Sequence, residues 1–324
     1  MAIQYLKICC TLSIGIVFFF NYLKKMLQAT GRSLYSTIAQ ILGAVTNMIL
    51  DPILIFVYLG HQKWVLQVRR LRQLLDSVLQ ELWQPHVIIN NNHDVKLSFK
   101  GFKPDLKIIG TIYAVGVPSI IMQSIGSIMT YCMNRILIEF SSTATAVFGV
   151  YFKLQSFFFM PVFGLNNGIT PIIAYNYGAK QRKRMIHTIK LSMAVAFCLT
   201  FVGFIAFEAI PQVLLGMFNS SQQLLEIGIP ALRIIGIHFL IAWFCIVAGT
   251  VFQALGKAVF SMIVSIMRQL FVLVPAAYIL AKVGGLHAVW WSFPIAEIIS
   301  LAVSLTFLIR IYNTIIKKLP EGRA

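Results

Sequence analysis

Charged residues are scarce in this sequence, and acidic residues are the scarcest. Only 11% of its 324 residues are charged, with 10 Asp and Glu against 27 Lys and Arg. A soluble globular domain is about 25% charged and about 45–50% apolar, whereas this chain is 58% apolar. The composition departs from both values in the direction of a membrane protein, and it excludes a disordered chain, which is poor in apolar residues.

Residue patterns that carry chemistry are also lacking. The 5 cysteines lie in apolar stretches without metal-ligand spacing, and the sequence has no nucleotide-binding loop, metal-ligand cluster or nucleophile–base pair. We therefore expect a protein that is not an enzyme, binds no metal or cofactor and is not an ATP-driven pump. The net charge of +17 comes without an RNA- or DNA-binding motif, so we expect no nucleic-acid partner.

Long apolar stretches are what the sequence does contain. A helix needs about 20 residues to span a bilayer, and eight stretches reach that length. They lie near residues 5–29, 34–59, 108–138, 142–174, 187–211, 229–254, 258–281 and 286–313. We predict an all-α, polytopic membrane protein. Its expected partner is the lipid bilayer of the cell membrane, in which it lies.

The segments between these stretches alternate in charge. The basic set comprises Lys24, Lys25, Arg32, Lys96, Lys100, Lys103, Lys107, Lys180, Arg182, Lys183, Arg184, Lys257, Arg310, Lys317 and Lys318. The other set, at 60–62, 139–142, 212–228 and 282–285, has little positive charge. Because basic loops face the cytoplasm, this alternation predicts a multi-pass topology with a cytoplasmic C-terminus.

Residues 61–107 do not fit this alternation. The stretch at 34–59 would end outside the cell and the stretch at 108–138 would start in the cytoplasm, so the chain must span the membrane once more between them. Residues 63–86 instead read as a soluble amphipathic helix that contains Arg69, Arg70, Arg72, Asp76 and Glu81. Each Arg or Asp at the centre of a spanning helix costs about 3 kcal/mol. Read one base later, codons for these residues permit MGVAGAAVATVAGQCFAGALAAA, an apolar small-residue segment that suits helix packing in membranes. We hypothesise a frameshift at about 63–86. The alternative is a genuine interfacial helix, and the nucleotide sequence decides between them.

An internal repeat organises the chain. Residues 31–60 align without a gap to residues 256–285, and LQATG (27–31) aligns to FQALG (252–256). Two pseudo-equivalent halves are common in transporters. We therefore expect a remnant N-terminal lobe at 1–89, with two spans and a disrupted third, a cytoplasmic inter-lobe loop at 90–107, and a complete six-helix C-terminal lobe at 108–324. The first three helices of the first half would be missing.

Three segments carry a family resemblance: NMILDPILIF (47–56), VGVPS (115–119) and GLNNGITPIIAYNYGAKQRKR (164–184). They resemble the multidrug and toxic compound extrusion (MATE) transporters, in particular the bacterial drug-export and DinF-like subgroup, over nearly all of the chain outside 61–89. The resemblance implies a two-lobe helical bundle, truncated at its N-terminus. It also implies an antiporter that exports small organic, often cationic compounds in exchange for H⁺ or Na⁺ by alternating access. We expect the chain to be a monomer.

Three alternatives to an active exporter stay open. The first is a lipid-linked oligosaccharide flippase of the same superfamily, which a basic central cavity would favour. The second is a non-functional product of a damaged transporter gene. The third is a partial transporter that works by pairing with another chain.

Asp51 is the foremost candidate for ion coupling. It lies within an apolar stretch one helical turn after Asn47, so both residues share a helix face, and a carboxylate at membrane depth is a functional candidate by default. The alternative is a helix-end acid before Pro52 that makes only local hydrogen bonds. The resemblance implies that Asp51 and Asn47 contribute to a cation site and that Asn21 matches a further ligand position.

The second half offers a different set of polar residues. Glu297 is its one clear acid at membrane depth, and the alternative to a functional role is charge neutralisation by Arg268 or Lys153. Uncharged polar residues expected on membrane helices are Gln123, Asn134, Asn166 and Asn167. They would line a cavity or bond helix to helix.

Overall fold

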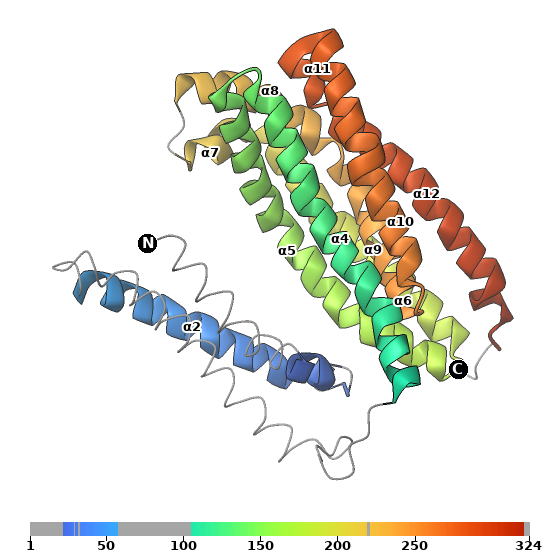
Figure 1. The fold of residues 1–324 in the computed structure, drawn as a ribbon. Coiled ribbons are helices and arrows are strands. Elements are labelled where there is room, and N and C mark those ends of the chain that lie inside the picture. Colours follow the sequence, from blue (N-terminus) through green and yellow to red (C-terminus); the bar gives the residue numbers. More distant parts are fainter. Residues whose placement is uncertain (1–21, 29, 32, 58–104, 219–220, 321–324) are drawn as a thin grey trace. The chain divides into compact units, whose positions relative to one another are not determined.

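The computed structural model describes residues 22–28, 30–31, 33–57, 105–218 and 221–320. These residues are helical or lie in turns and contain no strand, which confirms the predicted all-α class. The chain divides into two compact units, Met1–Lys103 and Pro104–Ala324 (Figure 1). Predictions that concern residues 1–21, 63–86 and 90–104 lie outside the described residues.

The described part of the first unit is a short helix at 22–28 followed by α2 (Ser33–Val57). Leu23 and Leu27 are fully buried and pack with Met26 and Tyr35, so the short helix lies against the start of α2. The side chain of Lys24 donates a hydrogen bond to the amide oxygen of Gln40 at 2.9 Å.

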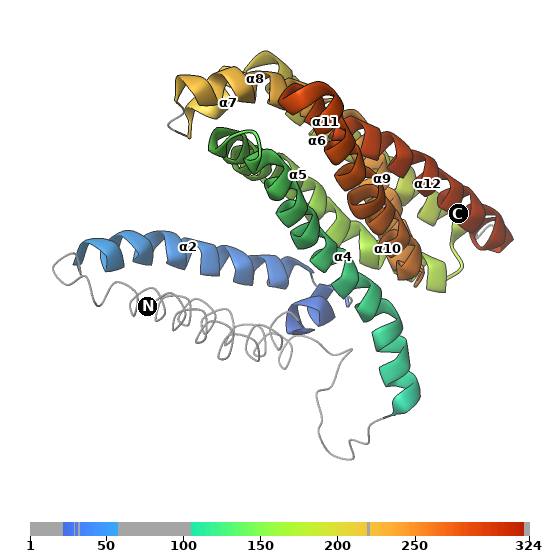
Figure 2. The same ribbon diagram turned by 45° about the horizontal axis from the view of Figure 1, so that its top comes forward.

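The second unit contains a helical bundle (Figures 1 and 2). Its helices are α4 (Leu106–Ile138), α5 (Ser142–Gly178), α6 (Arg182–Ala209), α7 (Pro211–Gly216), α8 (Gln222–Gly236), α9 (Phe239–Ala254), α10 (Ala258–Ile266), η1 (Met267–Leu273), α11 (Val274–Val289), α12 (Ser292–Thr314) and η2 (Ile316–Lys318). Within the described residues, 5 helices are long and apolar enough to cross a membrane, or 6 if the bent α8–α9 pair forms one span.

Side-chain caps mark the starts of three of these helices. Asp105 accepts a hydrogen bond from the backbone N–H of Lys107 before α4, and the hydroxyl of Ser141 accepts one from Ala144 at the start of α5. Ser221 caps α8 in the same way. Each cap provides an acceptor for an N–H that has no partner within its helix.

The repeat seen in the sequence recurs as a turn of the backbone. Gly31 precedes α2 with φ of 75°, and Gly256 precedes α10 with φ of 71°, a conformation that favours glycine. The N–H of Gly31 donates to the carbonyl of Gln28, and the N–H of Gly256 donates to that of Gln253. The aligned positions therefore adopt the same local turn.

Two stretches predicted as continuous helices are interrupted. The stretch at 229–254 bends by 52° between α8 and α9, because His238, Leu240 and Ile241 bond to carbonyls three residues back, which tightens the turn. The stretch at 258–281 widens into the π-helix η1. The next turn contains Pro275, which has no N–H to donate to the carbonyl four residues before it.

Apolar side chains pack in two clusters along the bundle. One combines the first half of α5, between Ala144 and Phe159, with the ends of α4 and α6 and the starts of α9 and α12. The other combines the second half of α5, between Val162 and Ile173, with the first half of α6 and the later halves of α9 and α12. Their boundary on α5 lies beside Pro161.

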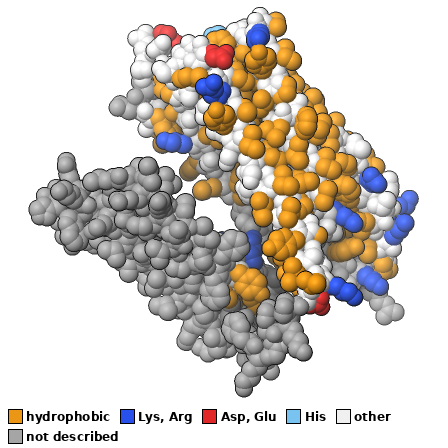
Figure 3. Space-filling view, in the orientation of Figure 1, with side chains coloured by type: hydrophobic (Ala, Val, Ile, Leu, Met, Phe, Trp, Pro, Cys, Tyr) orange, Lys and Arg blue, Asp and Glu red, His pale blue; other side chains and the backbone are white. Residues whose placement is uncertain are grey.

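The surface of the second unit suits a lipid environment. Large apolar side chains such as Ile112, Phe157, Val202 and Phe271 are exposed, and Figure 3 shows hydrophobic side chains along the unit with charged ones gathered toward its ends. The end where α5 meets α6, α9 meets α10 and α12 stops carries Lys180, Arg182, Lys183, Arg184, Lys257, Arg310, Lys317 and Lys318. We call this the basic end.

Candidate functional site in the second unit

An ion pair lies in the interior of the second unit. Arg268 Nη1 donates to Glu297 Oε2 at 3.3 Å, and the Glu297 side chain is 4% exposed against 31% for Arg268. Removing each ion from water costs several kcal/mol in a protein interior. The attraction between the two charges offsets this cost only when the geometry is good and further hydrogen bonds are made. Among the described residues, Oε1 of Glu297 has no hydrogen-bond partner, so the pair is incompletely satisfied.

Helix irregularities bring the two partners together. Arg268 is the second residue of η1, where the wide turn directs Gln269 and Leu273 into the bundle as buried residues. Glu297 lies in the second turn of α12, among the buried residues Phe293, Pro294, Ala296 and Ser300. Such π-helical turns occur frequently at functional sites.

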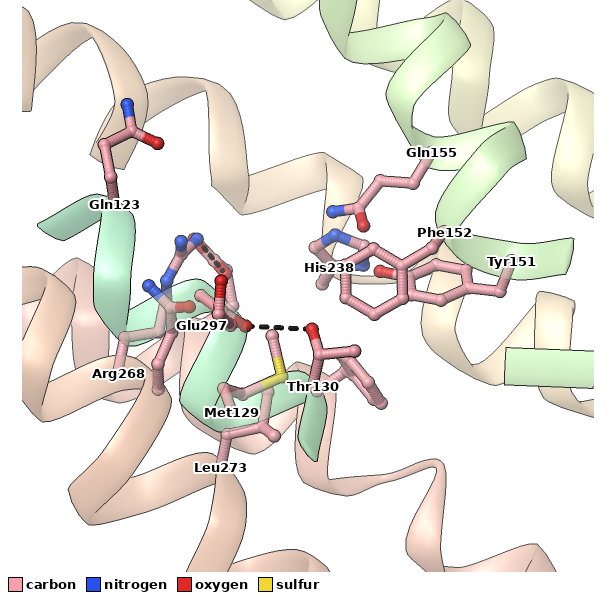
Figure 4. Close-up of a pocket in the computed structure, with 14 residues that line it drawn as sticks. Gln123, Met129, Thr130, Tyr151, Phe152, Gln155, His238, Arg268, Leu273 and Glu297 are labelled. Carbon is pink, nitrogen blue, oxygen red and sulfur yellow. Dashed lines mark hydrogen bonds and ion pairs between the residues drawn. The ribbon is translucent and has the colours of Figure 1, made fainter. Parts of the chain in front are cut away.

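The first cavity beside the pair has an aromatic wall, and we call it the aromatic cavity. Its volume is about 520 Å³, and its lining residues include Gln123, Thr130, Tyr151, Phe152, Gln155, His238, Arg268, Gln269, Phe293 and Glu297. Figure 4 shows Glu297 and Arg268 on one side, with His238, Tyr151 and Phe152 across from them. Tyr151 and Phe293 are in edge-to-face contact, with ring centroids 5.4 Å apart.

Two buried oxygen atoms on the lining residues of the aromatic cavity have no hydrogen-bond partner. They are the hydroxyl of Tyr151 and Oε1 of Glu297. His238 is also buried, and its Nδ1 bonds to the carbonyl of Ile235. Because a carbonyl oxygen only accepts, Nδ1 must carry the hydrogen. Both unpartnered oxygens are enclosed by protein atoms, and the cavity beside them, with an aromatic wall and a few polar groups, has the form of a small-molecule site.

The second cavity is lined mainly by amide and hydroxyl groups, and we call it the amide cavity. Its volume is about 470 Å³, and its lining includes Gln123, Asn166, Asn167, Thr170, Thr250, Gln253, Ser261, Ser265, Arg268, Ser300 and Ser304. The buried amide oxygen of Asn166 has no hydrogen-bond partner, and the hydroxyls of Ser300 and Ser304 lie beside the thiol of Cys245. Since Gln123 and Arg268 line both cavities, the ion pair lies where the two meet.

The predicted polar residues of the second half divide between these cavities. Glu297 lines the aromatic cavity, Asn166 and Asn167 line the amide cavity, and Gln123 lines both. Asn134 is half-buried on α4 and lines neither cavity. A functional role for these residues stays a prediction.

Of the two charge partners considered for Glu297, the structure brings Arg268 to it. Lys153 is exposed, and its Nζ lies 5.7 Å from the ring centroid of Phe218 instead. The sequence analysis missed Tyr151 and His238 as lining residues. An ionisable residue within an apolar span is the signal that would have singled out His238.

The candidates of the first unit are placed only by their backbone. Asn47 and Asp51 both lie in α2, four residues apart, so they share a face of that helix; their side chains and the whole of Asn21 lie outside the described residues. Among the residues that the structure describes, no group of three or more His, Cys, Asp or Glu is placed to hold a metal ion.

Comparison with known proteins gives one family. A family model described as MatE matches residues 118–279, which is half of the chain. The multidrug export protein MepA of Staphylococcus aureus (strain bovine RF122 / ET3-1) is 28% identical over 296 residues, covering 91% of this chain and 64% of that protein. The MepA protein of Staphylococcus haemolyticus (strain JCSC1435) is 29% identical over 299 residues, with the same coverages. The chain thus spans 64% of the length of these curated relatives.

Solved structures share the fold. An outward-facing multidrug resistance MATE family transporter of the MOP superfamily matches with a TM-score of 0.88 at 23% identity, covering 98% of this chain and 70% of that one. A crystal structure of MATE in the straight conformation matches with a TM-score of 0.84 at 24% identity, covering 94% and 68%. With its spanning helices and the family match over half of its length, the chain is a multi-pass helical membrane protein that belongs to the MATE family of transporters.

Proposed function

We propose that this chain acts in multidrug efflux, exporting small organic, often cationic compounds in exchange for H⁺ or Na⁺ by alternating access. The observation that carries the proposal is the family match at 118–279, which includes the aromatic-cavity residues on α4, α5 and η1 and His238 in the turn before α9. The names of the curated relatives, which are multidrug export proteins, favour drug export over a lipid-linked oligosaccharide flippase.

The polar groups of the second unit support a transport role. Its cavities hold hydrogen-bonding side chains and an ion pair. Because the two cavities meet at one ion pair, a compound bound in either cavity can change the contacts of that pair. A ligand shifts a protein toward the conformation that it binds better.

The arrangement of charge supports an orientation. The basic end of the second unit carries eight Lys and Arg residues, and such residues concentrate on the cytoplasmic side of membrane proteins. We therefore place the basic end, and with it the C-terminus, in the cytoplasm. The turn between α4 and α5, which contains Glu139, then faces outward.

Efflux in whole cells tests the proposal. The chain is expressed in a bacterium that lacks its major drug exporters, and ethidium accumulation is followed by fluorescence. We expect less accumulation than with an empty vector, and we expect the difference to vanish when the coupling gradient is collapsed. Dissipating the H⁺ gradient and omitting Na⁺ in separate runs identifies the ion. Equal accumulation with and without the chain, at verified membrane expression, would contradict the proposal and favour a non-functional product.

A further inference from the structure

A groove opens on the surface of the second unit where α5 ends and α6 begins. Its volume is about 520 Å³. Its lining residues come from the last two turns of α5 and the first two turns of α6, namely Ile172, Tyr175, Asn176, Lys183, Arg184, His187 and Thr188. We call it the basic groove. It shares no lining residue with the aromatic cavity or the amide cavity.

The walls of the basic groove are set by the turn between the two helices. The N–H of Ala179 donates to the carbonyl of Tyr175, and the N–H of Gln181 donates to that of Asn176, both at 2.8 Å. Asn176 is buried, and its side-chain amide donates to the carbonyl of Ile172 at 2.8 Å. The two helix ends that form the groove are therefore held together by the fold itself.

Positive charge gathers on the α6 side of the groove. Lys183, Arg184 and His187 are exposed, and among the described residues their side chains make no ion pair or hydrogen bond. The first turn of α6 contains no acidic residue. The N-terminus of a helix carries a partial positive charge, which favours anions and repels cations. An anion bound in the groove offsets this repulsion.

Apolar side chains continue from the groove toward the middle of both helices. Ile172 belongs to the groove wall and is exposed. Leu191 and Val195, one and two turns beyond His187 on α6, are exposed as well, and residues four apart share a helix face. Tyr175 lines the groove and is exposed, as is common for tyrosine where a membrane helix meets water. A ligand that fits this arrangement is anionic at one end and apolar along the rest.

We propose that the basic groove binds an anionic phospholipid. Its phosphate accepts hydrogen bonds from Lys183, Arg184 and His187, and its acyl chains lie along the exposed apolar side chains of α5 and α6. Hydrogen bonds between cationic side chains and phosphate are among the strong ones, and basic pockets between membrane helices bind the head groups of anionic lipids. The site lies outside both cavities, so it goes beyond the proposed export and does not depend on it.

Binding of single lipids to the purified chain tests the proposal. The chain in neutral detergent is titrated separately with dioleoyl phosphatidylglycerol, which is anionic, and dioleoyl phosphatidylcholine, which is zwitterionic. Native mass spectrometry gives the fraction of the chain that carries one lipid. We expect phosphatidylglycerol to bind at least about tenfold more tightly, because the side chains that attract the phosphate repel the choline group. Glycerol 3-phosphate, which has a phosphate without acyl chains, should not displace phosphatidylglycerol even in large excess.

Variants that remove equal charge make the test specific to the groove. Lys183→Gln with Arg184→Gln should weaken phosphatidylglycerol binding at least about tenfold and change phosphatidylcholine binding less than about threefold. Lys317→Gln with Lys318→Gln removes two charges from η2, which is also at the basic end but outside the groove, and should preserve the preference. Lys183→Arg with Arg184→Lys keeps the charges and should preserve it too. All four side chains are exposed, so thermal unfolding of these variants should match that of the unaltered chain.

Three results would overturn the assignment. Equal or absent binding of the two phospholipids by the unaltered chain would show that the groove does not select an anionic head group. An equal loss in the groove variant and the η2 variant would show a diffuse attraction to the basic end rather than a site. Displacement by glycerol 3-phosphate would assign the groove to a soluble phosphate compound. None of these measurements involves transport, so their outcome is separate from that of the ethidium assay.

Discussion

Removing one partner of the Arg268–Glu297 pair should destabilise the protein strongly, and removing both should not. The perturbations are Glu297→Gln, Arg268→Gln and the double variant. Each single change leaves a buried charge facing an uncharged amide, whereas the double change leaves two amides that hydrogen-bond without a net charge. The prediction therefore concerns the coupling between the two positions rather than either residue alone.

The magnitude follows from the different exposure of the partners. Breaking a buried ion pair by removing one partner costs about 3–5 kcal/mol. Glu297→Gln leaves Arg268, whose side chain is 31% exposed to the cavities, so water relieves part of the penalty and a value near 3 kcal/mol applies. Arg268→Gln leaves Glu297, which is 4% exposed, and a value near 5 kcal/mol applies. The double variant should cost about 1–2 kcal/mol, as for a buried hydrogen bond that is weakened.

Thermal unfolding of the purified proteins in detergent measures these differences. The three variants and the unaltered chain form a double-mutant cycle, and we expect a coupling energy of several kcal/mol, well above the additivity error of about 0.5 kcal/mol. Glu208→Gln, which breaks an exposed pair at 3.8 Å, should cost less than about 1 kcal/mol. Additive single and double changes would refute the reasoning, because the two side chains would then not depend on each other.

Three further predictions concern packing, coupling and the helix bend. Gly203→Ala should lower stability by about 1–3 kcal/mol relative to Gly149→Ala, because a Cβ at Gly203 would lie 2.9 Å from the ring of Phe239 while Gly149 has open space; thermal unfolding compares them, and equal stability contradicts the packing. Asp51→Asn should abolish ethidium export while Asp105→Asn, at the cap of α4, retains it; undiminished export by the former refutes its role. His238→Ala should cost about 2–5 kcal/mol, because it removes a buried ring that stacks on Phe159 and meets Phe239 edge to face; urea unfolding measures this, and an unchanged midpoint refutes it.

The helices of the second unit were predictable because their signal is local. Apolar runs of spanning length and turn residues such as Ser141 lie within a few positions of each helix end, and the bundle begins and ends its helices close to the predicted limits. The bend at 237–238 and the π-helix η1 were missed. Both features depend on whether a backbone N–H bonds to the carbonyl three, four or five residues before it. These hydrogen bonds are similar in energy, so packing around the segment decides between them rather than the sequence of the segment itself.

The candidate site was predictable in its residue types and not in its arrangement. Glu297 stood out because an acid at membrane depth is costly, and its neutralisation by Arg268 was one of two pairings considered. The aromatic cavity was not foreseen, since Tyr151 lies on α5, His238 lies in the turn between α8 and α9, and nothing in their sequence spacing brings them near Glu297. Asn134 has the same chemistry as Asn166 but faces neither cavity, so polarity alone does not identify a lining residue.

The ion pair lies where the packing of the bundle changes. Each of the two apolar clusters joins α5, α6, α9 and α12 over one half of their length, and such clusters hold helices together as units. The aromatic cavity is lined by Tyr151, Leu273 and Phe293 of the first cluster, and the amide cavity by Phe252 and Val264 of the second. Arg268, in the wide turn at η1, borders both cavities. The ion pair therefore lies where a cavity walled by one cluster meets a cavity walled by the other, so a substitution that moves either wall should change the surroundings of the pair.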